Sequence, residues 1–181
     1  MDPNTTEPLM PLNIAVLTVS DSRNESTDTS GGLLVERIQT AGHCLADKKI
    51  VIDDIYKIRA ALSDWIADNK TQAVLITGGT GFTARDSTPE AVKPLFDKTV
   101  EGFGELFRQV SVGQIGTSTI QSRALAGLAN QTVIFCMPGS TNACRTAWDD
   151  IICSQLDSRH KPCNFVAQLK SLEPATCQSR G

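Results

Sequence analysis

The chain has 181 residues, of which 40% are hydrophobic and 20% are charged, and its formal net charge is -3. This composition predicts one ordinary globular domain. Without a strongly basic field, a nucleic-acid duplex is not an expected partner. The apolar runs are too short to span a bilayer, and the N-terminal stretch MDPNTTEPLMP is polar and interrupted by proline. We therefore expect a cytoplasmic protein that neither carries a signal segment nor enters a membrane.

Apolar segments rich in β-branched residues alternate with helical patterns along the chain. After residues 1–11, which we expect to be disordered, LNIAVLTVS (12–20) predicts a buried strand. The spacing of Leu34 and Ile38 predicts a helix that stops at Gly42. Further strands are expected at 48–52, 73–77 and 132–137, and further helices at 54–68, just after residue 86, and from Ser140 to about Ile152.

This alternation predicts an α/β domain over residues 12–157, because strands joined by helices form a largely parallel sheet covered on both faces. Residues 158–181 contain Pro162 and Pro174 among scattered polar residues, and we expect them to form an extended arm with a loose tip.

The six cysteines include no C-x-x-C pair, and several lie inside apolar runs. In a cytoplasmic chain they are expected to be small core hydrophobes rather than metal ligands or disulfides. The two histidines, His43 and His160, have no partner at metal-ligand or triad spacing, and packing or surface positions are expected for both. A reaction whose nucleophile is already ionised, such as nucleotidyl transfer to a phosphate monoester, needs no histidine base.

Three of the predicted strands end in unusual segments. The strand at 73–77 is followed by GGTG (78–81), the strand at 132–137 by PGST (138–141), and the first strand by a polar stretch that closes with Gly31 and Gly32. Ligands of parallel sheets bind at this carboxyl edge. Glycines permit positive φ and close approach of a phosphate, although a plain strand-to-helix turn explains GGTG equally well. If phosphate binding is the reason, a larger residue at Gly79 should block it and leave the fold nearly intact.

Carboxylates stand close to the GGTG loop. Asp86 precedes Ser87-Thr88-Pro89-Glu90, which predicts a helix start through a Ser87–Glu90 capping box or a Thr88 cap. Asp86 is either a charge at a helix end or a ligand that holds magnesium against phosphates. Asp53 and Asp54 close the second predicted strand at the same edge, and one of the two is expected to be an exposed charge at the next helix start.

Five segments, met in order, resemble one known family. They are LTVSDSR with DTSGG, LITGGTGFTARDSTPEA, VEGFGELFRQ, TSTIQSRALAG and MPGSTNACRTAW. Together they resemble the molybdenum-cofactor biosynthesis proteins of the MoaB/MogA type, most closely MoaB, over residues 12–169. The resemblance implies a three-layer α/β/α sandwich, a homotrimer or homohexamer, and Mg-ATP-dependent adenylylation of molybdopterin with release of pyrophosphate. The family also includes scaffold members, so a molybdopterin-binding carrier oligomer with little or no turnover is the alternative.

The resemblance also implies roles for individual residues. Gly78, Gly79, Thr80 and Gly81 match the family's nucleotide-binding loop. Asp86 and Asp53 match its acidic residues, with implied roles in catalysis and in binding Mg²⁺, although Ile52 stands where the family often has proline and leaves the choice between Asp53 and Asp54 open. The molybdopterin and phosphate side is matched by Ser20, Asp21, Ser122, Arg123, Pro138, Gly139 and Ser140.

Overall fold

Six strands form one twisted sheet in the structure, a computed structural model that describes residues 7–171. The strands are β1 (Asn13–Val19), β2 (Cys44–Val51), β3 (Ala73–Thr77), β4 (Lys98–Thr99), β5 (Leu125–Ala129) and β6 (Thr132–Met137), in the order β2-β1-β3-β6-β5-β4. β2, β1, β3 and β6 run parallel, whereas β5 and β4 are antiparallel to their neighbours. The four predicted strands form the parallel part, so the expected fold class is confirmed.

The antiparallel edge was not predicted. β5 and β6 are joined by Asn130 and Gln131, both with positive φ (45° and 58°), as in a tight two-residue hairpin. The sequence of β5, LAGLA, has no β-branched residue, and its Gly127 lies against Phe96, where a Cβ would come within 2.4 Å of the ring. The strand β5 therefore depends on the close packing of Gly127 against the Phe96 ring, because its residues have low strand propensity.

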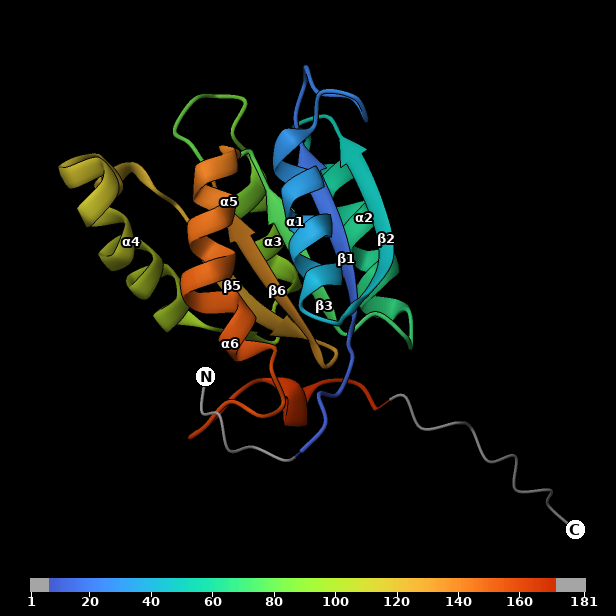
Figure 1. Cartoon of the computed structure of the whole chain (residues 1–181). Helices are drawn as coiled ribbons and strands as arrows, with labels where there is room; N and C mark the ends of the chain where they lie inside the picture. The colour runs from blue at the N-terminus through green and yellow to red at the C-terminus, as the bar shows by residue number, and fades with distance from the viewer. Residues whose placement is uncertain (1–6, 172–181) are drawn as a thin grey trace, which may run out of the picture.

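Helices cover both faces of the sheet (Figure 1). On one face lie α1 (Thr29–Thr40), α4 (Glu101–Ile115), α5 (Thr141–Ala147) and α6 (Cys153–Gln155), and on the other lie α2 (Ile55–Ala67) and α3 (Thr88–Val92). A π-helical turn at Trp148–Ile152 joins α5 to α6, so the helix predicted from Ser140 continues slightly beyond Ile152. The three-layer α/β/α arrangement agrees with the expectation.

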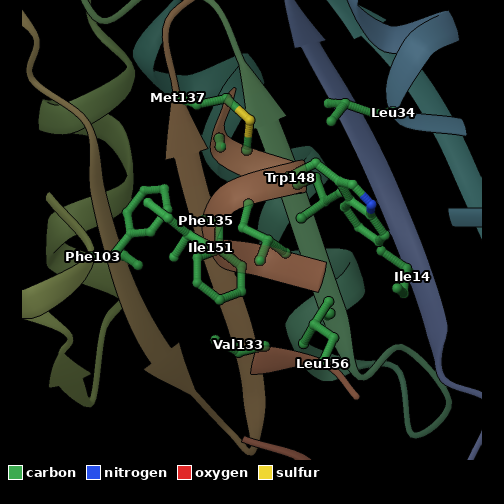
Figure 2. Close-up of a cluster of buried hydrophobic side chains, with 14 of the residues drawn as sticks. Ile14, Leu34, Phe103, Val133, Phe135, Met137, Trp148, Ile151 and Leu156 are labelled. Carbon is green, nitrogen blue, oxygen red and sulfur yellow. The ribbon is translucent and has the colours of Figure 1, made fainter. Parts of the chain in front are cut away.

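Two apolar cores separate these layers, because alternate residues of a strand point to opposite faces. Ile14, Val16 and Phe135 face α1, α4 and α5, whereas Leu17 and Ile134 face α2 and α3. Figure 2 shows the first core, in which the rings of Phe103 and Phe135 meet edge to face at 5.1 Å and Trp148 is buried beside them. These cores fix the ends of β1, β3 and β6 relative to one another.

The cysteine expectation holds for two of the residues. Cys136 and Cys144 are buried, Cys153 is half-buried, and Cys44 and Cys163 are exposed. Cys177 lies outside the described residues. Among residues 7–171 the cysteines are free, and burial raises the pKa of the Cys144 thiol to about 11. At neutral pH that thiol is therefore protonated and acts as a small core group.

The first and last described segments, residues 7–11 and 158–171, lie at the edge of the sheet where the parallel strands begin (Figure 1). Residues 7–11 contain no helix or strand, and the Met10 N–H donates to the Ser158 hydroxyl at 3.0 Å. The segment from 158 to 171 packs back on the domain through Leu169 and Lys170, which are buried. Residues 1–6 of the expected disordered segment and residues 172–181 of the expected arm lie outside the described residues.

Candidate functional site

A cavity of about 340 Å³ opens where β1, β3 and β6 end. It lies at the carboxyl edge of the parallel strands, where ligands of open α/β sheets collect. Nine of the residues expected at the site line it: Ser20, Gly78, Gly79, Thr80, Gly81, Asp86, Ser122, Pro138 and Gly139. The fold thus brings segments from four separate parts of the chain to one cavity.

The glycine loop after β3 has backbone angles that only glycine adopts easily. Gly78 has a φ of 101° and Gly79 one of 64°. A Cβ on Gly78 would lie 2.2 Å from the Val19 carbonyl oxygen, and one on Gly79 would lie 2.4 Å from the Thr88 Oγ1. The expectation that Gly79 can be enlarged with little effect on the fold is therefore wrong, since a side chain at this position would collide with the loop's own supports.

Asp86 lines the cavity and closes the turn that follows the glycine loop. Its Oδ2 accepts the Thr83 N–H at 2.8 Å, and a Cβ on Gly81 would come within 2.7 Å of the same oxygen. The Thr83 hydroxyl is the largest cause that lowers the pKa of Asp86 below its usual value, and it outweighs the opposing effect of burial. The carboxylate is consequently ionised at neutral pH and available to a cation.

The two aspartates after β2 have different surroundings. Asp54 is exposed and caps α2, because its Oδ1 accepts the N–H groups of Tyr56 and Lys57 at 2.9 and 3.0 Å. Asp53 is half-buried and faces the loop before α3, where its Oδ1 accepts the Ser87 N–H at 3.0 Å and the Ser87 hydroxyl. Asp54 is thus the expected helix-start charge, and Asp53 supports the loop from outside the cavity lining.

The capping contacts expected at the start of α3 do not form. The Ser87 hydroxyl donates to Asp53 instead of accepting a helix N–H, and the Glu90 carboxylate pairs with Arg123. The Thr88 hydroxyl donates to the Gly78 carbonyl oxygen at 2.8 Å, so it is no cap either. The helix begins where expected, but its polar side chains hold the glycine loop in place.

Arg123, which lies just before β5, donates hydrogen bonds to the backbone of the glycine loop and of the turn that follows it. Its Nη2 donates to the Asp86 carbonyl oxygen at 2.9 Å, and its Nε donates to the Thr80 carbonyl oxygen at 3.3 Å. The guanidinium also lies 5.1 Å from the centre of the Phe82 ring and pairs with Glu90. Ser122 lines the cavity, whereas Arg123 lies behind its wall.

Two further expected residues also lie outside the cavity lining. Asp21 forms a bidentate ion pair with Arg85 at 3.0 and 2.7 Å, and its Oδ1 accepts the Asp53 N–H at 3.0 Å. The hydrogen bond from Arg85 is the main reason that the pKa of Asp21 is lowered. Ser140 caps α5 through its bond with the Ala143 N–H at 3.1 Å, as its sequence position predicts.

Seven further described residues line the cavity that were not expected individually as site residues: Thr18, Val19, Arg23, Asp28, Ser30, Thr77 and Gln121. Asp28 is the N-cap of α1, where its Oδ1 accepts the Gly31 N–H at 2.8 Å, and the Ser30 hydroxyl donates to the Gly139 carbonyl oxygen at 2.8 Å. Aspartate is a preferred N-cap residue, so its place before the helix predicted from Leu34 and Ile38 could have located Asp28. The other six carry no comparable signal of their own.

The remaining expectations concern metals and membranes. Within residues 7–171, no three or more histidine, cysteine, aspartate or glutamate side chains converge as a metal site would need. Mg²⁺ is nevertheless often held by one or two carboxylates together with substrate phosphates, so a single cavity carboxylate such as Asp86 fits that ion. None of the helices in this part of the chain is both long and apolar enough to cross a membrane.

Comparison with known proteins agrees with this geometry. A family model described as a probable molybdopterin binding domain matches residues 15–158. The chain belongs to this family. Molybdenum cofactor biosynthesis protein B of Escherichia coli (strain K12) is 60% identical over 161 residues, which cover 89% of this chain and 95% of that protein.

Solved structures of the family have the same fold. A crystal structure of molybdenum cofactor biosynthesis protein B has a TM-score of 0.80 at 42% identity and covers 83% of this chain and 94% of its own. The tungsten cofactor synthesizing protein MoaB from Pyrococcus furiosus has a TM-score of 0.71 at 38% identity and covers 78% and 90% of the two chains. The molybdopterin-binding family fold is therefore established for this chain.

Proposed function

We propose that this protein acts in molybdenum cofactor biosynthesis by transferring the adenylyl group of Mg-ATP to molybdopterin. An oxygen of the terminal phosphate of molybdopterin forms a bond to the α-phosphorus of ATP, the bond from that phosphorus to the bridging oxygen breaks, and pyrophosphate leaves. The phosphate nucleophile is already ionised, so the reaction needs positioning and charge compensation rather than a base. None of the described residues that line the cavity is a histidine.

The ionised Asp86 carboxylate beside the glycine loop is the observation that carries this proposal. The Gly78 N–H is engaged with the Met137 carbonyl oxygen at 3.1 Å, which holds the loop on β6. Phosphate contacts are then assigned to the next residues, Gly79 and Thr80, which line the cavity. Asp86 would hold Mg²⁺, and the ion would neutralise charge on the phosphates. Asp53 would keep the loop before α3 in register through Ser87.

One observation favours the alternative of a molybdopterin carrier with little turnover. Of the two expected acids only Asp86 lines the cavity, because Asp53 lies behind Gly79, with its Oδ1 bonded to Ser87 and its Oδ2 beside the Gly79 backbone. A carrier would bind molybdopterin without needing a metal-holding carboxylate. The two functions share the cavity and differ in what Asp86 does.

The direct test is pyrophosphate release by purified protein supplied with molybdopterin and Mg-ATP. Adenylylation predicts one pyrophosphate for each molybdopterin consumed and none when molybdopterin is left out. A carrier predicts saturable molybdopterin binding, measured by fluorescence or calorimetry, without pyrophosphate in either mixture. Hydrolysis of ATP that does not depend on molybdopterin would argue against both.

We also propose that the protein is a homotrimer or homohexamer. Four of the exposed large apolar side chains lie on α4 and on the turn that follows it: Leu106 is 41% exposed, Val112 53%, Ile115 51% and Ile120 78%. In Figure 1, α4 lies at the edge of the domain beside α5. Apolar surface of this kind supports association, and closed symmetric assembly is the usual outcome. Light scattering at micromolar concentration tests it, and a monomer would contradict it.

A further inference from the structure

Lys48 connects β2 to the loop that forms one wall of the cavity. Its Nζ lies 2.8 Å from Glu25 Oε2 and 3.1 Å from Asp28 Oδ2, and its side chain is only 17% exposed. Burial lowers its pKa, but the hydrogen bonds to Glu25 and Asp28 outweigh this, so that the pKa of Lys48 is raised overall. The ammonium is therefore a fixed positive charge under the loop at residues 20–28.

The carboxylate of Asp28 is a buried negative charge in the cavity wall. Its side chain is fully buried, its Oδ1 accepts the Gly31 N–H at 2.8 Å, and its Oδ2 accepts the Thr18 hydroxyl at 2.9 Å. Both Asp28 and Thr18 are among the residues that line the cavity. Because charges interact strongly through a protein interior, an unbalanced carboxylate at this place would repel an anion in the cavity.

We propose that Lys48 is a positioning residue that balances the charge of Asp28 and ties residues 20–28 to β2, so that this wall accepts a phosphate anion. Lys48 itself lies outside the cavity and contacts no ligand. The identity of the anion rests on the function proposed above. The balance between Lys48 and Asp28 can be tested with any small polyphosphate that fits the cavity.

The proposal predicts effects of opposite sign for the two partners. Lys48→Met leaves the Asp28 carboxylate uncompensated and should weaken anion binding about tenfold. Asp28→Asn keeps an oxygen for the Gly31 N–H and leaves Lys48 paired with Glu25 alone, so the site loses one negative charge and should bind the anion at least as tightly as the parent protein. The double variant should return close to the parent affinity. A purely structural role for the Lys48–Asp28 pair predicts instead that both single variants bind more weakly.

The experiment is titration calorimetry of inorganic pyrophosphate into the full chain at fixed magnesium, at low and at high sodium chloride. Lys49→Met is the matched control. It removes the same charge from the next residue of β2, whose Nζ lies over the Trp65 ring at 5.0 Å and 3.5 Å from Asp47, away from the cavity loop. We expect parent-like affinity for Lys49→Met, and a loss for Lys48→Met that shrinks as salt increases.

Unchanged affinity in Lys48→Met, or weaker binding in Asp28→Asn, would overturn the proposal, as would a parent protein that does not bind pyrophosphate. If Lys48→Met fails to fold, Asp28→Asn and the double variant still decide the matter, because their affinities must both equal or exceed that of the parent. Pyrophosphate binding is independent of adenylylation. A protein that shows the charge effect but releases no pyrophosphate from ATP would refute the proposed function and leave the role of Lys48 standing.

Discussion

The two ends of the parallel sheet use polar side chains in different ways. At the end where the strands finish, polar groups surround an open cavity, as Asp86 and Ser122 do. At the end where the strands begin, polar groups are buried and bond to the backbone. The His43 Nδ1 accepts the Leu12 N–H at 3.2 Å, and the Gln72 Nε2 donates to the Lys170 carbonyl oxygen at 2.7 Å. Substitutions at the first end should therefore affect activity, and those at the second should affect stability.

The largest effect is expected at Asp86. If its carboxylate acts on the charge that develops at phosphorus, Asp86→Asn should lower adenylylation about a hundredfold, or about 3 kcal/mol, with molybdopterin still bound. The thermal midpoint should change little. Asp54→Asn is the matched control, since it makes the same chemical change at an exposed helix cap. Full activity with slightly lower stability would remove Asp86 from the chemistry.

Gly79 is the expected exception to this division, because it lines the cavity and yet its substitution should lower stability. Gly79→Ala forces a Cβ into the left-handed region and within 2.4 Å of the Thr88 Oγ1, so the free energy of unfolding should fall by about 2 kcal/mol. Urea unfolding measures this change. Gly113→Ala, in α4 where a Cβ meets nothing within 4 Å, should instead stabilise slightly. Equal effects for both variants would contradict the assigned strain.

A substitution of Lys170 tests whether the end of the sheet where the strands begin contributes to stability alone. Its Nζ donates to the carbonyl oxygens of Ile66 and Asp68 at 2.8 and 2.6 Å, at the C-terminal end of α2. Lys170→Met leaves these carbonyls without that donor and should cost about 1–2 kcal/mol of stability while adenylylation stays unchanged. Urea unfolding and pyrophosphate release are the measurements, with the exposed Lys57→Met on α2 as control. A loss of activity without a loss of stability would refute the division between the two ends.

The smallest expected effect is a pH dependence at His43. Burial lowers the pKa of this imidazole below its ordinary value of 6.5, and the nearby charges of Asp157 and Arg159 act in opposite directions. The unfolded chain therefore binds a proton more readily than the folded one, so stability is fully present above about pH 6.5 and falls as the pH drops through that value. His43→Asn keeps an acceptor for Leu12 and should show a shallower loss between pH 7 and 5.5.

Sequence patterns predicted the parallel half of the molecule better than its antiparallel edge. β1, β3 and β6 are continuous apolar runs because both of their faces are covered. β2 begins at Cys44, four residues before the expected start, because its first residues, CLAD, lie exposed or half-buried at the sheet edge and include no β-branched residue. β5 depends on the packing of Gly127 against Phe96, a contact between residues far apart in sequence that no local pattern contains.

The same distinction between local patterns and contacts of distant residues explains which parts of the site could be predicted. Glycines at strand ends indicated the loop at 78–81, because positive φ is a local property of the backbone. The partners of polar side chains are not local. Ser87 and Glu90 have the spacing of a capping box, yet they bond to Asp53 and Arg123, which reach them through the fold. Resemblance to the family supplied the remaining site residues, but it did not tell which of them face the cavity.

The contact between the loops after β3 and β6 also bears on when the cavity forms. A Cβ on Gly139 would lie 3.2 Å from the Gly78 Cα, so the two loops touch although 61 residues separate these glycines. The Thr77 hydroxyl also donates to the Pro138 carbonyl oxygen, across the same separation in sequence. Contacts between distant residues form slowly, because a long loop must close first. During synthesis, a chain that has not yet added β6 lacks this wall. Ligand binding then stabilises only the completed fold, and molybdopterin would slow its unfolding without helping its early folding steps.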